Sequence, residues 1–443
     1  MNEEFHYKNG ELFCEGVPVQ QIAAKVGTPV YIYSQNHFLK QHQAIVEGFK
    51  EVDPLVCYSV KANSNLGLLR AMALAGSGFD AVSKGEVYRA LRAGADPQKI
   101  VFAGVGKQPE EIDYALEQGI LMFNVESEAE LETISKAAAK RKCEAPIALR
   151  INPDVDPKTH KYISTGKREN KFGIDIARAE ACAKRIKELK NLRLRGLHLH
   201  IGSQITYADR HSEAIDKVTP FINSLKKQDF PLEFLNVGGG FGISYHPGEG
   251  LPIGDFAKAM APKIKALGLK MLCEPGRFIS GNGGVMLTQV IYDKPSGDKH
   301  FLIVDGAMND LLRPSIYQAF HLAWPVKSPG LPDGAALANN SPLTDKNLGK
   351  DAVTYDVVGP ICESGDYFAL GRKLPKMNDG ELLCVFSAGA YGYTMASNYN
   401  TRGRPPEVIV DGDKYWVSRQ REKLEDLIRG ERLTPSETFS AKA

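Results

Sequence analysis

Between residues 56 and 277 the sequence alternates eight times between a short apolar run and a longer helix-like stretch. The runs have the length and composition of buried strands, and several of the stretches between them end in glycine, as helices often do. Eight such repeats predict a (β/α)8 barrel of parallel strands inside a ring of helices. A doubly wound open sheet is the structural alternative. The candidate strands are residues 56–62, 79–83, 100–104, 121–127, 146–152, 194–202, 233–240 and 270–277.

The two ends of the chain have a different pattern. Beyond the barrel, short β-type runs separated by Gly, Pro, Asp and Asn predict an antiparallel β-domain, and the strand-like run at 29–34 is expected to join it. One stretch rich in Pro, Gly, Asn and Ser is interpreted as a surface insertion. The predicted divisions are N-terminal strands (1–35), the barrel (36–280), the β-domain (281–420, with the insertion at 325–351), and a C-terminal helix and tail (421–443).

Charge and hydropathy exclude several classes of protein. Lys and Arg number 55 against 53 Asp and Glu, so the formal net charge is only +2, and no block of like charges predicts binding to nucleic acid. The sequence has neither an apolar run long enough for a membrane helix nor a signal peptide, so we expect a cytoplasmic protein. Its seven scattered cysteines match neither a disulfide framework nor a zinc ribbon.

The carboxyl ends of the strands form the active-site face of a (β/α)8 barrel, and four of the predicted ends carry functional groups. Each group also has an ordinary interpretation: a solvent-reaching lysine, a core histidine, a tight turn, a surface ion pair. Together they favour a planar cofactor that carries a phosphate, with an amine able to form a Schiff base and a carboxylate able to keep a ring nitrogen protonated. These groups are Lys61, His200 with Ser203, Gly238–Gly240, and Glu274 with Arg277.

A further candidate lies outside the predicted barrel, in GPICESGD (359–366). Cys362 is there either a small buried hydrophobic residue or, beside Glu363, an exposed thiol that donates a proton. No G-x-S-x-G, P-loop or H-E-x-x-H motif is present, which argues against the common hydrolases, nucleotide hydrolases and zinc peptidases. His198 and His200 lie on one face of a strand without a third ligand, so no metal site is predicted.

These motifs resemble those of the fold-type III, pyridoxal phosphate-dependent decarboxylases, and most of all the diaminopimelate decarboxylases among them. The resemblance runs from about residue 10 to about residue 420. One departure is a long spacing between Arg313 and Cys362, with the excess in the insertion at 325–351. The shared motifs are YSVKAN, GFDAVSKGE, NKFGI, HLHIGSQ, NVGGGFG, EPGR, GPICESGD and GAYGY.

The resemblance implies a role for each matching residue. Lys61 would bind pyridoxal 5'-phosphate covalently, His200 would lie against its ring, and Glu274 would face its ring nitrogen, with Arg150 a less certain partner of Glu274. Cys362 would be the proton donor. The residues implied near the phosphate are Ser203, Gly240, Gly276, Arg277 and Tyr391, and those implied to bind substrate are Arg277, Arg313, Tyr317, Glu363 and Tyr391.

The implied reaction is decarboxylation of meso-2,6-diaminopimelate to L-lysine, the last step of lysine biosynthesis. Two arginines suit the substrate's distal carboxylate and Glu363 suits its ammonium group. The resemblance also implies a homodimer with active sites shared between subunits. The alternatives are a decarboxylase of the same fold acting on ornithine, arginine, lysine or a polyamine precursor, and a cofactor carrier or pseudoenzyme. Against a pseudoenzyme, Lys61, Glu274 and Cys362 are all present, and against a carrier stands the second domain with Cys362 and Glu363, because an intact Lys61 fits carriers too.

Overall fold

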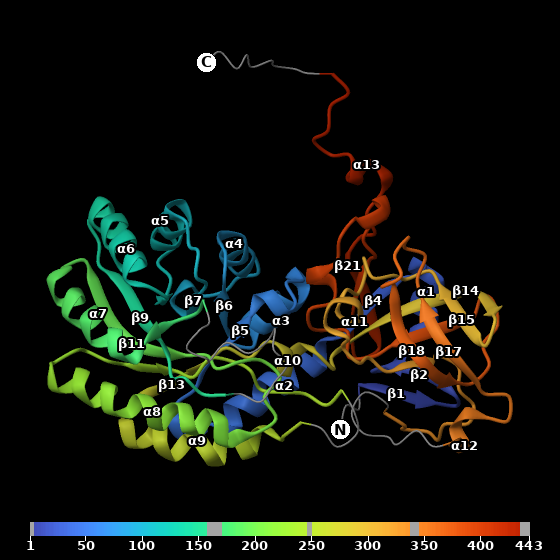
Figure 1. Cartoon of the computed structure of the whole chain (residues 1–443), viewed down its shortest axis with the longest axis horizontal. Helices are drawn as coiled ribbons and strands as arrows, with labels where there is room; N and C mark the ends of the chain where they lie inside the picture. Colours follow the sequence, from blue (N-terminus) through green and yellow to red (C-terminus); the bar gives the residue numbers. More distant parts are fainter. Residues whose placement is uncertain (1–3, 157–170, 246–249, 337–344, 435–443) are drawn as a thin grey trace.

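The computed structural model describes residues 4–156, 171–245, 250–336 and 345–434. It consists of a barrel and a β-domain side by side, and the first strands of the chain lie in the β-domain although the barrel follows them in sequence (Figure 1). None of the helices in these ranges combines the length and the apolar character needed to cross a bilayer.

The barrel is closed by eight parallel strands that follow one another in chain order. The last strand returns to the first through the pair Leu272 and Leu55, and the fourth pairs with the fifth through Phe123 and Ile147. The predicted (β/α)8 barrel is therefore confirmed. The strands are β5 (Leu55–Ser59), β6 (Gly78–Ala81), β7 (Ile100–Phe102), β8 (Met122–Val125), β9 (Ala145–Asn152), β11 (Leu192–Leu199), β12 (Phe234–Asn236) and β13 (Lys270–Cys273), with the two-residue β10 (Ile174–Asp175) beside β9.

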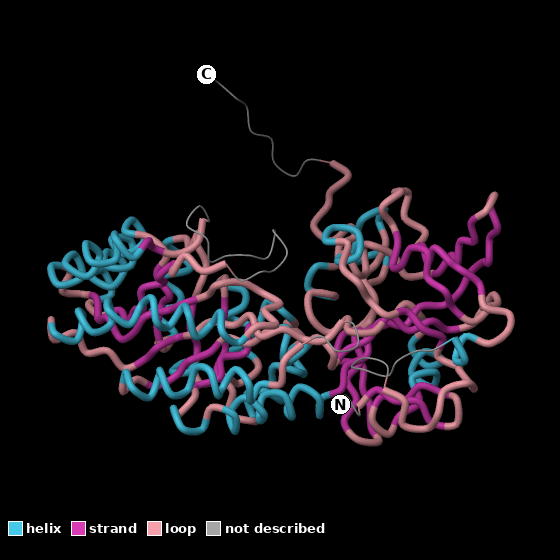
Figure 2. Tube along the Cα trace, turned by 60° about the horizontal axis from the view of Figure 1, so that its bottom comes forward, coloured by secondary structure: helices cyan, strands magenta, loops and turns pink. Residues whose placement is uncertain are grey.

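Helices surround these strands (Figure 2). Local capping explains where two of them begin, because Ser83 and Ser127 each accept a hydrogen bond from the backbone N–H three residues later. Basic residues in their last turns complement the helix dipole. The outer helices are α2 (Gln35–Gly48), α3 (Leu66–Leu74), α4 (Lys84–Arg92), α5 (Pro109–Gln118), α6 (Glu128–Arg141), α7 (Ile176–Glu188), α8 (Ala208–Lys227) and α9 (Ile253–Leu267).

The β-domain is built on a sheet whose order is β18-β17-β15-β14-β4-β20-β21. The early strand β4 lies in its centre, fully buried, antiparallel to β14 and parallel to β20. The sheet is antiparallel except for that pair and β15 with β17. Its strands are β4 (Val30–Ser34), β14 (Gly284–Ser296), β15 (Lys299–Val304), β17 (Val353–Val358), β18 (Tyr367–Leu374), β20 (Glu407–Asp411) and β21 (Lys414–Arg419), while β16 (Ala323–Pro325) and β19 (Leu382–Val385) pair beside β14.

The insertion is packed more tightly than a surface loop. Backbone N–H groups of Tyr7 and Leu12 donate to the carbonyls of Ala335 and Val326, and Val326 is only 1% exposed. The first part of the insertion is therefore held against the N-terminal strands, and residues 337–344 lie outside the described ranges. The N-terminal strands β1 (Phe5–Lys8), β2 (Glu11–Cys14) and β3 (Val17–Pro18) form a separate small sheet.

Short helices complete the chain. The predicted C-terminal helix is reduced to a single turn, and its apolar residues Leu424 and Ile428 are exposed, so packing does not stabilise a longer helix there. Two other short helices, α10 (Arg277–Ser280) and α11 (Arg313–Tyr317), each begin with an arginine that lines the cavity at the barrel mouth. The short helices are α1 (Val19–Val26), α10 (Arg277–Ser280), α11 (Arg313–Tyr317), α12 (Asp345–Leu348) and α13 (Leu424–Leu427).

Candidate active site

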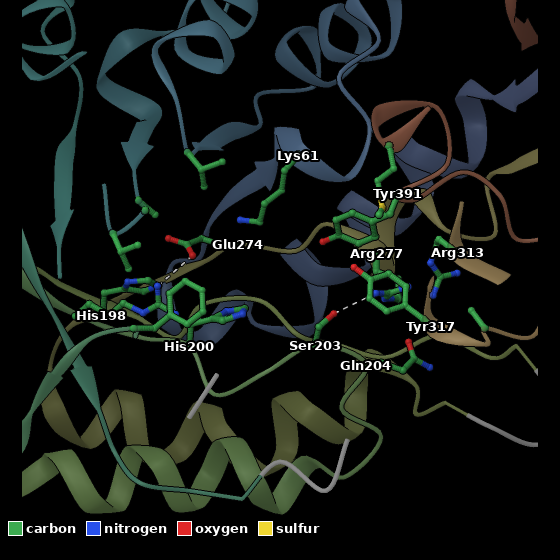
Figure 3. A pocket seen from close by; sticks show the side chains of 18 of the residues that line it. Lys61, His198, His200, Ser203, Gln204, Glu274, Arg277, Arg313, Tyr317 and Tyr391 are labelled. Atoms are coloured by element: carbon green, nitrogen blue, oxygen red, sulfur yellow. Dashed lines mark hydrogen bonds and ion pairs between the residues drawn. The ribbon is translucent and has the colours of Figure 1, made fainter. Parts of the chain in front are cut away.

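A cavity of about 630 Å³ opens at the carboxyl ends of the barrel strands and extends to the β-domain. Figure 3 shows Lys61 above it, His198, His200 and Glu274 toward one end, and the arginines toward the other. The cavity thus brings together residues that are far apart in sequence. The predicted site residues on its wall are Lys61, Arg150, His200, Ser203, Glu274, Arg277, Arg313, Tyr317 and Tyr391.

Lys61 follows the first barrel strand rather than ending it. The strand stops at Ser59, and Lys61 lies in the 3-10 turn Val60–Ala62, which aims its side chain into the cavity. Its Nζ is 2.7 Å from Oδ2 of the fully buried Asp80, at the end of β6. Although burial alone would lower the pKa of Lys61, the Asp80 carboxylate raises it above its usual value.

The Glu274 carboxylate has three hydrogen-bonding partners. Asn124 and Asn236 donate to Oε1 at 2.8 and 2.6 Å, and His198 Nε2 lies 3.1 Å from Oε2. Burial alone would raise the pKa of Glu274, but His198 and its other neighbours hold that pKa well below the usual range. Glu274 is therefore ionised at neutral pH, although the residue is only 5% exposed.

Arg150, predicted as a less certain partner of Glu274, binds elsewhere. Its Nη1 donates to Oε1 of Glu126 at 2.6 Å, and both side chains are buried. The strand order explains the difference: His198 of β11 is in register with Arg150 of β9, but β11 is one strand nearer to β13, which Glu274 follows. His198, and not Arg150, reaches the Glu274 carboxylate.

His200 is held against the glycine-rich turn after β12. Its Nδ1 accepts from the backbone N–H of Gly239 at 3.2 Å, so the ring proton is on Nε2, and burial keeps the pKa of His200 well below its usual value. At Gly240, φ is +95° and an added Cβ would lie 2.3 Å from the carbonyl oxygen of Gly202. Only glycine therefore lets the two loops approach this closely.

The opposite end of the cavity carries two buried guanidinium groups, from Arg277 and Arg313 (Figure 3). Arg277 Nη2 lies 3.3 Å from Ser203 Oγ, and its guanidinium stacks on the Tyr391 ring at 4.9 Å. Arg313 Nη1 contacts His321 Nε2 at 2.9 Å. Among the described residues, no carboxylate forms an ion pair with either arginine.

The loop with Cys362 and Glu363 is not part of this cavity within a single chain. Both residues are exposed, between β17 and β18, and neither lines the wall. The Cys362 backbone N–H donates to Asn400 Oδ1 at 3.0 Å, and the Tyr399 hydroxyl donates to the Glu363 carboxylate. The described chain therefore does not bring the predicted proton donor to Lys61.

The geometry agrees with comparisons to known proteins. Residues 35–281 match the family model described as "Pyridoxal-dependent decarboxylase, pyridoxal binding domain". The chain is also 45% identical, over 98% of its length and 100% of the relative's, to a diaminopimelate decarboxylase from Pseudomonas aeruginosa. The chain belongs to the pyridoxal-dependent decarboxylases. This decarboxylase is also 43% identical to the diaminopimelate decarboxylase of Aquifex aeolicus, over 96% of its own length and 97% of the relative's.

A solved structure shows the same likeness. The diaminopimelate decarboxylase from Helicobacter pylori, complexed with L-lysine, superposes with a TM-score of 0.85 at 40% identity, over 93% of this decarboxylase and 98% of that chain. The predicted resemblance and the pyridoxal phosphate cofactor are thereby confirmed, and the protein is an enzyme.

The residues of the cavity fit this cofactor. A primary amine, an ionised carboxylate and a flat imidazole face one space, which suits an aldehyde-bearing cationic ring. Two buried polar atoms on the wall, Nε of Arg277 and Nδ1 of His198, have no hydrogen-bond partner within the described part of the chain. A polar ligand can satisfy such atoms.

Sequence reasoning missed the residues that hold the predicted ones in place. Asn124 and Asn236 could have been noticed as amides inside otherwise apolar strands, and Asp80 as a carboxylate in another. Tyr245 and His321 offered no such signal, because both lie outside the strands and meet the arginines only through the fold.

Proposed function

We propose that this decarboxylase removes one α-carboxylate of meso-2,6-diaminopimelate, forming L-lysine and carbon dioxide in the last step of lysine biosynthesis. The observation that carries the proposal is the pair of buried arginines, Arg277 and Arg313, across the cavity from Lys61 and without a carboxylate partner among the described residues. Diaminopimelate has a second amino-acid head whose carboxylate fits that pair. The names of the relatives and the lysine complex support the same substrate.

Pyridoxal phosphate, when bound, supplies the ring that accepts the electrons left by the departing carboxylate. Lys61 would hold the cofactor through its amine, and Glu274, fixed in position by His198, Asn124 and Asn236, would keep the ring nitrogen protonated. His200, on the same wall, would lie against the ring. The residues we assign to the cofactor are Lys61, His200, Ser203, Gly240, Glu274, Gly276, Arg277 and Tyr391.

The distal half of the substrate is assigned to the other end of the cavity. Arg277 and Arg313 would bind its carboxylate, with Tyr317 and Tyr391 beside them on the cavity wall. Glu363, which lies outside the cavity of its own chain, would accept from the ammonium group once a second subunit brings it there. This arrangement disfavours ornithine, a substrate whose distal end has an amine but no carboxylate.

Cys362 is proposed to protonate, from Sγ, the carbon that has lost its carboxylate. Cys362 and Glu363 are exposed and lie outside the cavity of their own chain, so we propose a homodimer in which this loop of one subunit completes the cavity of the other. The cytoplasmic location expected from the sequence stays a prediction.

The function is tested by measuring carbon dioxide release from meso-diaminopimelate, ornithine, arginine and lysine with the holoenzyme. Release from diaminopimelate alone, with lysine as product, is expected. Release from a substrate with one carboxylate would keep the cofactor chemistry and reject the proposed role of the arginines. If none of the four substrates released carbon dioxide, the proposed reaction would be rejected in favour of a cofactor carrier or a pseudoenzyme.

The shared site is tested with two inactive variants, Lys61→Ala and Cys362→Ala. If sites are shared, dissociating and reassociating a mixture forms hybrid dimers with one intact site, and about a quarter of the wild-type activity returns. The two variants kept apart serve as the control. A mixture as inactive as its components would reject the shared site.

A further inference from the structure

We propose that Tyr245 is a positioning residue that holds Arg277 and Arg313 in the convergent arrangement that binds the distal carboxylate of the substrate. The proposal rests on the proposed function, because it assigns a new residue to the recognition of that carboxylate. Tyr245 lies after the glycine-rich turn and lines the cavity together with both arginines.

The contacts of Tyr245 connect the two arginines. Its hydroxyl oxygen accepts a hydrogen bond from Arg277 Nη1 at 2.5 Å. The same ring lies 5.0 Å from the Arg313 guanidinium and 5.8 Å from that of Arg277. A single side chain thus contacts both cations, with its oxygen bound most directly to Arg277 and its ring nearer to Arg313.

The charges explain why such a side chain is needed. Arg277 is 7% exposed and Arg313 is 6% exposed, and two buried cations in one cavity repel each other. Burial lowers the pKa of Arg313, and the positive charge of Arg277 lowers it further. Without an electron-rich group between them, the guanidinium groups would turn apart and separate the donors that the carboxylate requires.

Tyr245 is electronically suited to this position. Burial alone would raise the pKa of its hydroxyl, but the charges of Arg277 and Arg313 lower that pKa below its ordinary value. The same two charges make the hydroxyl oxygen a favourable place for electron density, and that oxygen accepts the hydrogen bond from Arg277 Nη1.

The surrounding contacts leave this task to Tyr245. The neutral His321 accepts from Arg313 through Nε2 and donates through Nδ1 to the backbone carbonyl of Phe386, so it fixes Arg313 from behind. Within the described part of the chain, Arg277 has the longer contact to Ser203 at its other nitrogen and stacks on the Tyr391 ring, and neither contact reaches Arg313 as Tyr245 does. Removal of the Tyr245 oxygen is therefore expected to affect the direction of Arg277 first, because Arg277 Nη1 donates to it, and that of Arg313 less, because His321 also holds Arg313.

The test compares two ligands that differ by one carboxylate. L-lysine keeps the amino-acid head that the arginines are proposed to bind, whereas cadaverine has the same two amines and no carboxylate. Calorimetric titration of the holoenzyme is expected to show that Tyr245→Phe weakens lysine binding about tenfold and changes cadaverine binding less than about twofold. In turnover, the KM for diaminopimelate rises by a similar factor while kcat stays near the wild-type value.

Tyr292→Phe is the matched control, because it removes a hydroxyl from a side chain that is 59% exposed in the β-domain. It is expected to bind both ligands as the wild type does. Equal weakening of lysine and cadaverine by Tyr245→Phe, or no change in either, would overturn the proposal. Its outcome is separable from that of the proposed function, which fails if the wild-type holoenzyme releases no carbon dioxide from diaminopimelate.

Discussion

At one end of the cavity, the carboxylate of Glu274 has three hydrogen-bonding partners from three different barrel strands. At the other end, Arg277 and Arg313 are equally buried, yet among the described residues their contacts are a serine, a histidine and tyrosines, without a carboxylate. A buried charge is costly unless it is matched. We call the Glu274 end, whose charge is satisfied by the chain, the matched end, and the end with Arg277 and Arg313 the unmatched end. The matched end is suited to a constant part of the reaction, and the unmatched end to an anion that arrives with the substrate.

The comparison predicts that changes at the matched end lower kcat, whereas changes at the unmatched end raise KM. Interactions that stabilise charge developing in the reaction affect the chemical step, and interactions that hold an unreacting part of the substrate affect binding. The following changes are ordered by the size of their expected effect.

Lys61→Ala removes the amine that is proposed to hold the cofactor. Because the whole reaction depends on that cofactor, this change is expected to have the largest effect. Activity should fall by at least about 1,000-fold, and the absorption band of the lysine-bound cofactor, near roughly 420 nm, should disappear. Lys84→Ala, an exposed lysine at the start of α4, is the control. Persistence of the band after dialysis would reject the assignment of Lys61.

Glu274→Gln removes the charge at the matched end while keeping its shape. We expect kcat to fall by about 100-fold, because a neutral amide no longer keeps the ring nitrogen protonated, and KM to change little. The lowered pKa of Glu274 means that its charge is lost only when the pH falls to that pKa. The wild-type kcat should therefore show no loss from this group between pH 5 and 8, and a near-normal rate in the variant would contradict the role.

Arg313→Met tests the unmatched end. Loss of one of the two cations is expected to raise the KM for diaminopimelate by about 30-fold, with kcat within a few-fold of the wild type. Because the lost charge has no carboxylate partner in the described chain, the melting temperature should not fall. A decrease in kcat with an unchanged KM would erase the distinction between the two ends.

His211 supports the glycine-rich turn from behind and is expected to give the smallest effect. Its Nε2 donates to the Gly239 carbonyl at 3.1 Å, and burial lowers its pKa to about 4. The unfolded chain takes up this proton first as the pH falls below about 6.5, so His211 should cost about 0.7 kcal/mol of stability between pH 7 and 6. Thermal melting of the wild type and His211→Asn checks this, and identical pH slopes would contradict it.

Local sequence patterns predicted the barrel strands and the glycine-rich turn, because burial of a short strand and close backbone approach each require particular residue types within a few positions. Most barrel strands are short, largely apolar runs buried on both faces, and eight such runs alternating with helices predict a closed barrel. The glycines of the turn after β12 are required by close backbone approach. By contrast, the partners of Glu274 and Lys61 depend on which strands become neighbours and at what register.

Features that depend on neighbouring residues could be predicted from the sequence, whereas features that depend on residues far apart in the chain needed the folded structure. The sequence alone determined the barrel, the β-domain that includes an early strand, and the residue types of the site, because periodicity and motifs are properties of neighbouring residues. Only the tertiary structure decided that Asp80 raises the pKa of Lys61, that His198 rather than Arg150 meets Glu274, and that Cys362 lies outside its own chain's cavity. Charge pairing and burial depend on distances between residues far apart in the chain, and folding alone sets those distances.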